Sequence, residues 1–108
     1  MSNPQFLTIN PATGLSSWIT QSLQSVVAQF PEVRAAYLFG SRARGDFQPG
    51  SDIDLAIDAP SMTAASFTQL WDQIDALPIA FPLDCLWLQA LPDSPLKTMI
   101  ARDALALT

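Results

Sequence analysis

The sequence predicts a single mixed α/β domain in which one small mixed sheet is flanked by helices. A chain of 108 residues is large enough for one domain with its own core. Apolar residues recur every three or four positions in some segments and every two positions in others, as in amphipathic helices and half-buried strands. The predicted order is helix, strand, short helix, strand, helix, strand, helix.

The chain begins with a stretch that has neither the helix period nor the strand period of apolar residues. Residues 1–14 include Pro4, Pro11 and Gly14, and we expect a tail or an extended arm there, with the domain spanning 15–108. Residues 15–30 predict an amphipathic helix that Pro31 ends. Its apolar stripe consists of Leu15, Trp18, Ile19, Leu23, Val26, Val27 and Phe30.

A short apolar strand followed by a tight turn is predicted next. The run 35–39 ends abruptly at Gly40, which can turn sharply and lets a ligand approach the bare backbone. We expect Ser41 to cap a short helix that starts at Arg42. The start of a helix presents unpaired N–H groups and partial positive charge, so this turn can hold a phosphate, with Arg42 and Arg44 as additional donors.

After a turn at 46–50, the segment 51–58 has the period of a half-buried strand. Its apolar residues share one face, whereas Asp52 and Asp54 lie together on the other. Two carboxylates this close raise each other's pKa unless a cation lies between them. Hard oxygen ligands in this arrangement suit Mg²⁺ carried by a nucleoside triphosphate.

Three further elements complete the predicted domain. A helix fits residues 63–77 and ends at Pro78, the apolar segment 81–88 is a strand, and residues 92–107 form the last helix. Asp84 lies in the apolar strand, where an unpaired charge is costly to bury. We therefore expect Asp84 to join the same metal site.

Composition excludes several classes of function. The net charge is −5 and the basic residues form no stripe, which disfavours a polymerase that works along DNA or RNA. Histidine is absent, which excludes Ser-His-Asp hydrolysis, histidine-ligated zinc and phosphohistidine chemistry. The hydrophobic fraction of 49% with only 14% charged residues indicates that another chain covers some apolar surface.

Cysteine content and hydropathy suggest the compartment. The single cysteine, Cys85, lies in an apolar run and is expected in the core of a protein from a reducing compartment. No apolar run is long enough to span a bilayer, and the N-terminus lacks the pattern of a signal peptide. We expect a cytoplasmic protein without membrane contact.

The glycine-serine turn and the paired aspartates together resemble the minimal nucleotidyltransferases of the DNA polymerase β-like superfamily. The signature of that family is Gly-Ser, ten residues, then Asp-x-Asp, and here it reads Gly40-Ser41, ten residues, Asp52-Ile53-Asp54. The resemblance extends to Ala-Arg-Gly at 43–45, to Ser51 before the first aspartate, and to a later single aspartate on a strand, Asp84. It implies a palm-like fold over nearly the whole chain.

The resemblance also implies an activity and a set of site residues. The activity is nucleotidyl transfer with two Mg²⁺ ions and ATP as substrate. Asp52, Asp54 and Asp84 would be the catalytic metal ligands, with Asp84 also helping to deprotonate the acceptor hydroxyl. The implied nucleotide-binding residues are Gly40, Ser41, Arg42, Arg44 and Ser51. Each arginine could equally be a solvated helix residue, and the match to Ala-Arg-Gly favours Arg44.

The small size of the chain bears on the acceptor. A bare domain of this size resembles the antitoxin of a two-gene system that is paired with a HEPN-domain ribonuclease toxin. The resemblance then implies transfer of AMP to a toxin hydroxyl, typically a tyrosine, without direct binding of nucleic acid. Two alternatives remain open: an antitoxin that blocks its partner sterically, and an adenylyltransferase that modifies a small hydroxyl compound such as an aminoglycoside.

Overall fold

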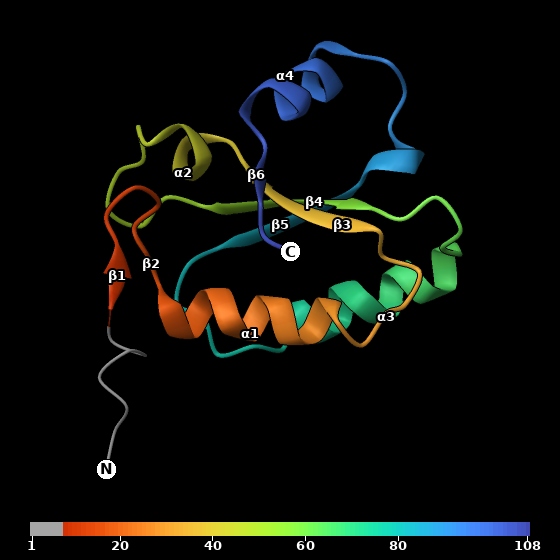
Figure 1. Ribbon diagram of the computed structural model, residues 1–108, viewed down its shortest axis with the longest axis horizontal. Helices are drawn as coiled ribbons and strands as arrows, with labels where there is room; N and C mark the ends of the chain where they lie inside the picture. Colours follow the sequence, from red (N-terminus) through yellow and green to blue (C-terminus); the bar gives the residue numbers. More distant parts are fainter. Residues whose placement is uncertain (1–7) are drawn as a thin grey trace.

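The computed structural model describes residues 8–108 and contains one four-stranded sheet, one small hairpin and four α-helices (Figure 1). The elements are β1 (Ile9–Asn10), β2 (Leu15–Ser16), α1 (Ser17–Val27), β3 (Ala35–Phe39), α2 (Ser41–Arg44), β4 (Ile53–Asp58), α3 (Ala64–Asp75), β5 (Leu83–Trp87), the 3-10 turn η2 (Leu88–Ala90), α4 (Pro95–Asp103) and β6 (Leu105–Ala106). The predicted mixed α/β class is confirmed.

The sheet is mixed, with the strand order β5-β4-β3-β6. β3 runs antiparallel to both β4 and β6, whereas β5 runs parallel to β4. The end of β3 and the beginnings of β4 and β5 therefore lie at the same end of the sheet. The chemistry-bearing residues of the sequence are concentrated there.

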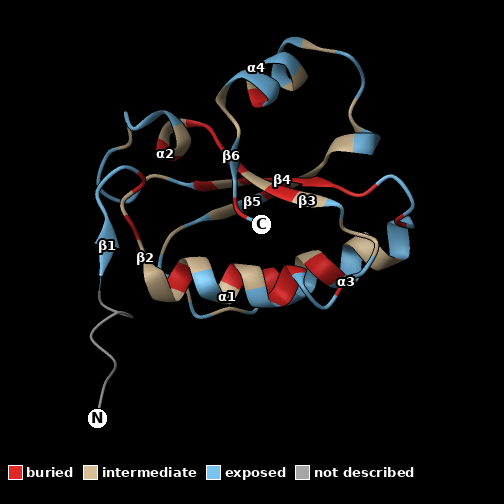
Figure 2. Cartoon of the chain, viewed as in Figure 1, coloured by how far each residue is buried: buried red, intermediate tan, exposed pale blue. Residues whose placement is uncertain are grey.

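Helices cover both faces of the sheet (Figure 1). α1 and α3 lie on one face and enclose the main core, to which β4 contributes Ile53, Leu55 and Ile57. α4 lies over the other face, where a smaller core joins Ile100 to Phe39 and other residues. Figure 2 shows the buried positions in red along β3 and β4 and on α1 and α3. The predicted alternation of β4 is confirmed, because Ile53, Leu55 and Ile57 face the main core, whereas Ala56 lies in the smaller core on the other face.

Three helices begin at side-chain caps. The hydroxyl of Ser16 accepts from the Ile19 N–H, and that of Thr63 accepts from the Ser66 N–H. Ser94 caps α4, which has proline at its first position. Such caps satisfy backbone donors that the first helical turn leaves unpaired, so short polar residues mark these helix starts in the sequence.

The predicted last helix, 92–107, is wrong at both ends. α4 begins at Pro95 and ends at Asp103, after which Leu105–Ala106 pair with β3 as β6. The Leu107 N–H donates to the Ala36 carbonyl, and the Leu107 side chain enters the main core. Pairing at the open edge of β3 satisfies backbone groups that a continued helix would leave exposed.

The expected arm at residues 1–14 falls partly on described residues. From residue 8 onward it lies within the fold, because Ile9–Asn10 pair antiparallel with Leu15–Ser16. Residues 1–7 lie outside the described residues. The same pairing moves the start of the predicted helix 15–30 to Ser17. The helix ends at Val27, and Phe30 beyond it remains buried.

Cys85 is buried in the main core, as predicted. Burial and, to a smaller extent, the nearby Asp84 carboxylate together raise the pKa of its thiol to about 12. Over residues 8–108, the structure contains no helix that is both long and apolar enough to cross a membrane.

Candidate functional site

The three predicted catalytic aspartates lie at one end of the sheet. Asp54 is the second residue of β4 and Asp84 the second residue of β5, and the two are direct partners in the parallel pairing. Neighbouring strands are about 4.8 Å apart, and paired residues point to the same face. Asp52 precedes β4 and shares the face of Asp54 through the alternation of the chain. This face is the one that carries α4, away from the main core.

The Gly40 backbone lies directly against the Asp54 carboxylate. Phe39, the last residue of β3, pairs with Asp54, so the chain turns at Gly40 beside that side chain. Gly40 has φ +75° and ψ −154°, a conformation open essentially only to glycine. A Cβ atom built on Gly40 would lie 2.5 Å from Asp54 Oδ2. Both the backbone conformation and the contact therefore require glycine at this position.

Gly40 also starts α2, which corrects the expected capping role of Ser41. Gly40 occupies the cap position and its carbonyl accepts from the N–H groups of Ala43 and Arg44. Ser41 is the first helical residue, and no side chain caps this helix. The helix starts one residue earlier because the turn at Gly40 already points its carbonyl along the helix. The Ser41 hydroxyl therefore has no capping role and is free to bind a ligand.

Arg42 is buried with 2% exposure, so it is not the solvated helix arginine that we considered. Its guanidinium donates to the Thr13 carbonyl at 2.9 Å and twice to the Ser51 carbonyl, at 3.1 and 2.9 Å. It also stacks over the rings of Phe47 and Phe81, 5.3 and 4.4 Å from their centroids. These contacts give Arg42 a structural role, and its predicted contact with a nucleotide stays a prediction.

Ser51 likewise has structural partners. Its hydroxyl accepts from the Gln48 N–H at 2.8 Å, and its carbonyl accepts from Arg42. These bonds fix the residue that immediately precedes Asp52. The structure thus supports a role for Ser51 in shaping the loop, while its predicted contact with a nucleotide stays a prediction.

Arg44 is a cation whose charge acts on Asp54. Burial and the neighbouring aspartates raise the pKa of Asp54, and the charge of Arg44 offsets a smaller part of that rise. The Arg44 side chain is 37% exposed, so it can reach a bound ligand. It forms ion pairs with Asp46 at 3.2 Å and with Asp103 at 2.9 Å. Sequence reasoning missed Asp103, because an aspartate at the end of an amphipathic helix has the pattern of an ordinary solvated residue.

Asp58, the remaining acidic residue of β4, takes no part in this site. It ends the strand, as predicted, at the opposite end of the sheet from Asp52. Its carboxylate pairs with Arg34 at 2.8 Å and accepts from the Gln89 amide at 2.6 Å.

The carboxylates repel one another. Partial burial raises the pKa of Asp54 above its ordinary value, and the negative charges of Asp84 and Asp52 raise it further. The charged form of Asp54 is therefore disfavoured in the folded protein. A cation placed among the three side chains would relieve this repulsion.

We expect Asp54→Asn to be more stable than wild type at pH 7.5 in the presence of a chelator. Because the pKa of Asp54 is higher in the folded than in the unfolded chain, wild type loses stability as the pH rises through the folded pKa. The advantage of the variant should vanish below the ordinary aspartate pKa of about 3.9. Urea unfolding of both proteins at several pH values measures this difference in stability. A variant that is less stable than wild type at pH 7.5 would contradict the repulsion among the aspartates.

The donor set fits Mg²⁺, although the described residues contain no ready-made cluster of three or more histidine, cysteine, aspartate or glutamate side chains. Asp52, Asp54 and Asp84 supply carboxylate oxygens, the ligands that Mg²⁺ prefers. Mg²⁺ also uses phosphate oxygens of its substrate rather than an all-protein cage, so an incomplete protein ligand set is the expected arrangement. Asp52 and Asp84 are exposed and can reach a ligand.

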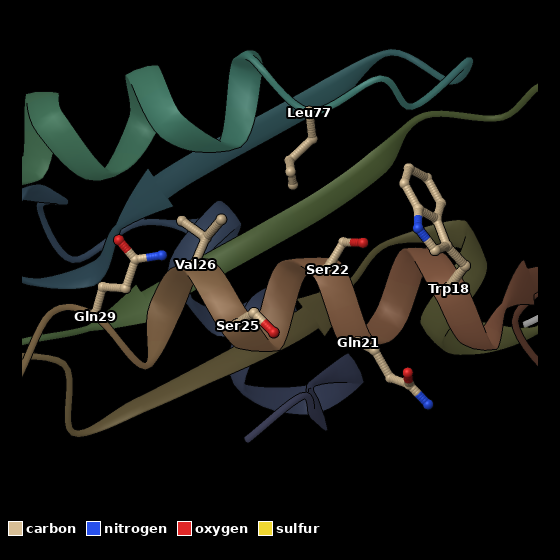
Figure 3. A pocket seen from close by; sticks show the side chains of 7 residues that line it. All are labelled: Trp18, Gln21, Ser22, Ser25, Val26, Gln29 and Leu77. Carbon is tan, nitrogen blue, oxygen red and sulfur yellow. The ribbon is translucent and has the colours of Figure 1, made fainter.

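A separate hollow of about 690 Å³ lies on the outer side of α1 (Figure 3). It is lined by Trp18, Gln21, Ser22, Ser25, Val26, Gln29 and Leu77. None of these side chains carries a charge, and α1 covers the face of the sheet opposite to the aspartates. This hollow therefore offers no charged side chain to a metal ion or a phosphate.

A comparison with known protein families identifies a nucleotidyltransferase match that spans the aspartate site. The family described as polymerase beta, nucleotidyltransferase matches residues 21–105 of this chain. This range includes Gly40, Ser41 and all three aspartates. No curated protein sequence matches this chain significantly.

Several solved structures share the fold. A toxin-antitoxin crystal structure with AMP-PNP is 20% identical with a TM-score of 0.67, covering 82% of this chain and 72% of that one. The toxin-antitoxin MntA-HepT is 19% identical with a TM-score of 0.62, covering 86% and 72%. A nucleotidyltransferase structure from Sulfolobus solfataricus is 21% identical with a TM-score of 0.51, covering 81% and 73%. At these identities the likeness extends to the fold alone.

Proposed function

Because this chain belongs to the polymerase beta nucleotidyltransferase family, we propose that it is an antitoxin enzyme that transfers AMP from Mg-ATP to a hydroxyl group of a partner toxin. The toxin is a HEPN-domain ribonuclease in the cytoplasm, the acceptor is a tyrosine, and the modification inactivates the nuclease. The proposal combines a metal-nucleotide site on this chain with a protein acceptor on another.

The observation that carries the proposal is the pairing of Asp54 with Asp84 beside Gly40. The parallel register of β4 and β5 aligns two carboxylates, and the turn after β3 brings bare backbone against one of them. A steric antitoxin would have no need for aligned, mutually repelling carboxylates next to a turn that only glycine can adopt. The repulsion between these carboxylates destabilises the fold, and a site that binds a metal and a nucleotide explains why the repulsion is present.

In this mechanism the residues of the chain bind and orient. Asp52, Asp54 and Asp84 would hold two Mg²⁺ ions, which would supply positive charge to the reacting phosphate. Ser41 and the Gly40 backbone hold the β- and γ-phosphates, and Arg44 neutralises part of their charge.

Asp84 has a second role, as the general base. It accepts the proton of the acceptor hydroxyl, whose oxygen forms a bond to the α-phosphorus of ATP while the bond from that phosphorus to the bridging oxygen breaks. The products are the AMP ester of the toxin and pyrophosphate. Asp84 is exposed at the start of β5, so a hydroxyl from another chain can reach it.

Two observations support a protein partner. Two of the structures that share the fold are toxin-antitoxin complexes, one of them with AMP-PNP. The chain is also rich in apolar and poor in charged residues, as is typical of proteins that bury surface against another chain.

The test is to incubate this protein with Mg²⁺, ATP and the product of the adjacent gene, and to measure the intact masses of both proteins. We expect the partner to gain one or more AMP units and to lose its ribonuclease activity. Omission of Mg²⁺ should prevent the gain. An unmodified partner that is nevertheless inhibited in a complex would establish steric inhibition instead, and modification of an aminoglycoside without any partner would establish a small-molecule enzyme.

A further inference from the structure

We propose that Asp103 is a positioning residue of the nucleotide site, which holds the Arg44 guanidinium at the end of α2 so that it can bind a phosphate of ATP. The inference rests on the proposed function, because it assigns the residue that orients one of its phosphate ligands. It also makes the end of α4 part of the site, although Asp103 itself touches no substrate.

The contact joins two elements that are far apart in sequence. Arg44 ends α2 and Asp103 ends α4, with the Arg44 Nη1 donating to Asp103 Oδ2 at 2.9 Å. The Asp103 side chain is only 5% exposed, whereas that of Arg44 is 37% exposed. A sheltered carboxylate thus fixes one side of an arginine whose other side faces solvent.

Asp103 is better suited to this role than Asp46, the second acidic partner of Arg44. Asp46 is 63% exposed and lies only two residues from Arg44, and its bond to Nε is longer, at 3.2 Å. Exposed ion pairs of this kind contribute little, because water screens them and both side chains lose rotational freedom. The bond to Asp103 is shorter and is sheltered on its carboxylate side, so it decides the orientation.

The orientation of the Arg44 guanidinium that results favours the binding of a phosphate. Asp46 occupies Nε and Asp103 occupies Nη1, whereas Nη2 takes part in neither ion pair. Arg44 ends α2, the short helix that starts at Gly40 against the Asp54 carboxylate. A guanidinium that is already held at the end of this helix loses less rotational freedom when it binds a phosphate, which increases affinity.

The opposite role of Asp103 makes a different prediction. If Asp103 merely competed with phosphate for Arg44, removing its charge would release the arginine and strengthen the binding of ATP. If Asp103 positions Arg44, removing its charge weakens binding, because the arginine then samples many orientations. The direction of the change therefore distinguishes the two roles.

The test compares wild type with Asp103→Asn, which keeps the size of the side chain and removes its charge. We expect the dissociation constant of Mg-ATP, measured by isothermal titration calorimetry, and the KM for ATP to rise about tenfold. We expect kcat to change less than about twofold, since Arg44 contributes to binding rather than to the proton transfer. Melting temperatures of all variants verify that they are folded.

Three further variants complete the experiment. Arg102→Gln is the matched control, because Arg102 pairs with the same carboxylate at 3.0 Å but is 70% exposed, and its loss should leave ATP binding unchanged. Asp103→Glu restores the charge and should recover part of the affinity. In Arg44→Gln/Asp103→Asn, the loss should be no greater than in Arg44→Gln alone, as expected for residues that act through one another.

The outcomes separate this inference from the proposed function. Wild type that binds Mg-ATP and modifies the partner, together with an Asp103→Asn variant of equal or higher affinity, would overturn the positioning role alone. Wild type that binds no nucleotide would overturn the proposed function and this inference with it. An equal loss of affinity in Arg102→Gln would show that any change at the end of α4 weakens binding, which also overturns the specific positioning role of Asp103.

Discussion

Replacement of both aspartates, in Asp52→Asn/Asp54→Asn, is expected to reduce AMP transfer by about a thousandfold or more. Both side chains keep their size, but neither can neutralise a divalent cation, and electrostatic stabilisation of a transferring phosphoryl group is the largest contribution to catalysis of this type. The measurement is the initial rate of AMP incorporation into the partner at saturating ATP. The loss should appear in kcat, because the interaction that is removed is strongest in the transition state.

The matched control is Asp72→Asn/Asp75→Asn. It removes the same charge from two exposed aspartates of α3, on the opposite face of the sheet, and should leave the rate unchanged. ATP with Mg²⁺ at a hundredfold excess over its dissociation constant should stabilise wild type and the control by about 2.7 kcal/mol, but not the site variant. A site variant that is folded and retains AMP transfer would contradict the assignment of these aspartates as metal ligands.

Replacement of Arg42 by methionine is expected to cost about 3 kcal/mol of folding free energy. Methionine fills much of the same volume, but the carbonyls of the buried Thr13 and the half-buried Ser51 lose their donors. The stacking on Phe81 is lost as well. Urea unfolding of both proteins in the absence of nucleotide measures the difference.

The loss of Arg42 should also disturb the aspartate site, because Arg42 connects three segments of the chain near that site. It joins the chain before β2, the residue that precedes Asp52, and the ring of Phe81 just before β5. Arg42→Lys keeps the charge but cannot reproduce the planar, branched donor geometry, so it should recover only a minor part of the stability. An Arg42→Met protein as stable as wild type, with weakened ATP binding alone, would instead restore the predicted role of Arg42 at the nucleotide.

The sequence by itself was sufficient to predict the strands that carry the aspartates. Alternation of polar and apolar residues in β4 is a local property, and it correctly placed Ile53 and Leu55 in the core and Asp54 on the other face. Gly40 was identified in the same way, since an apolar run that stops at glycine indicates a sharp turn. The spacing between Gly40 and Asp54 reflects a single antiparallel pair of adjacent strands, β3 and β4, which sequence patterns describe well.

Only the tertiary structure decided the features that depend on partners distant in the chain. The pairing of Asp84 with Asp54 requires the parallel contact of β5 with β4, and β6 exists because the edge of β3 was open to pairing. Arg42 and Arg44 are alike in sequence, yet Arg42 is buried by two carbonyls and two aromatic rings, while Arg44 is partly exposed and pairs with Asp103 at the end of α4. Such roles depend on tertiary contacts between residues that are distant in the chain, and local periodicity contains no information about those contacts.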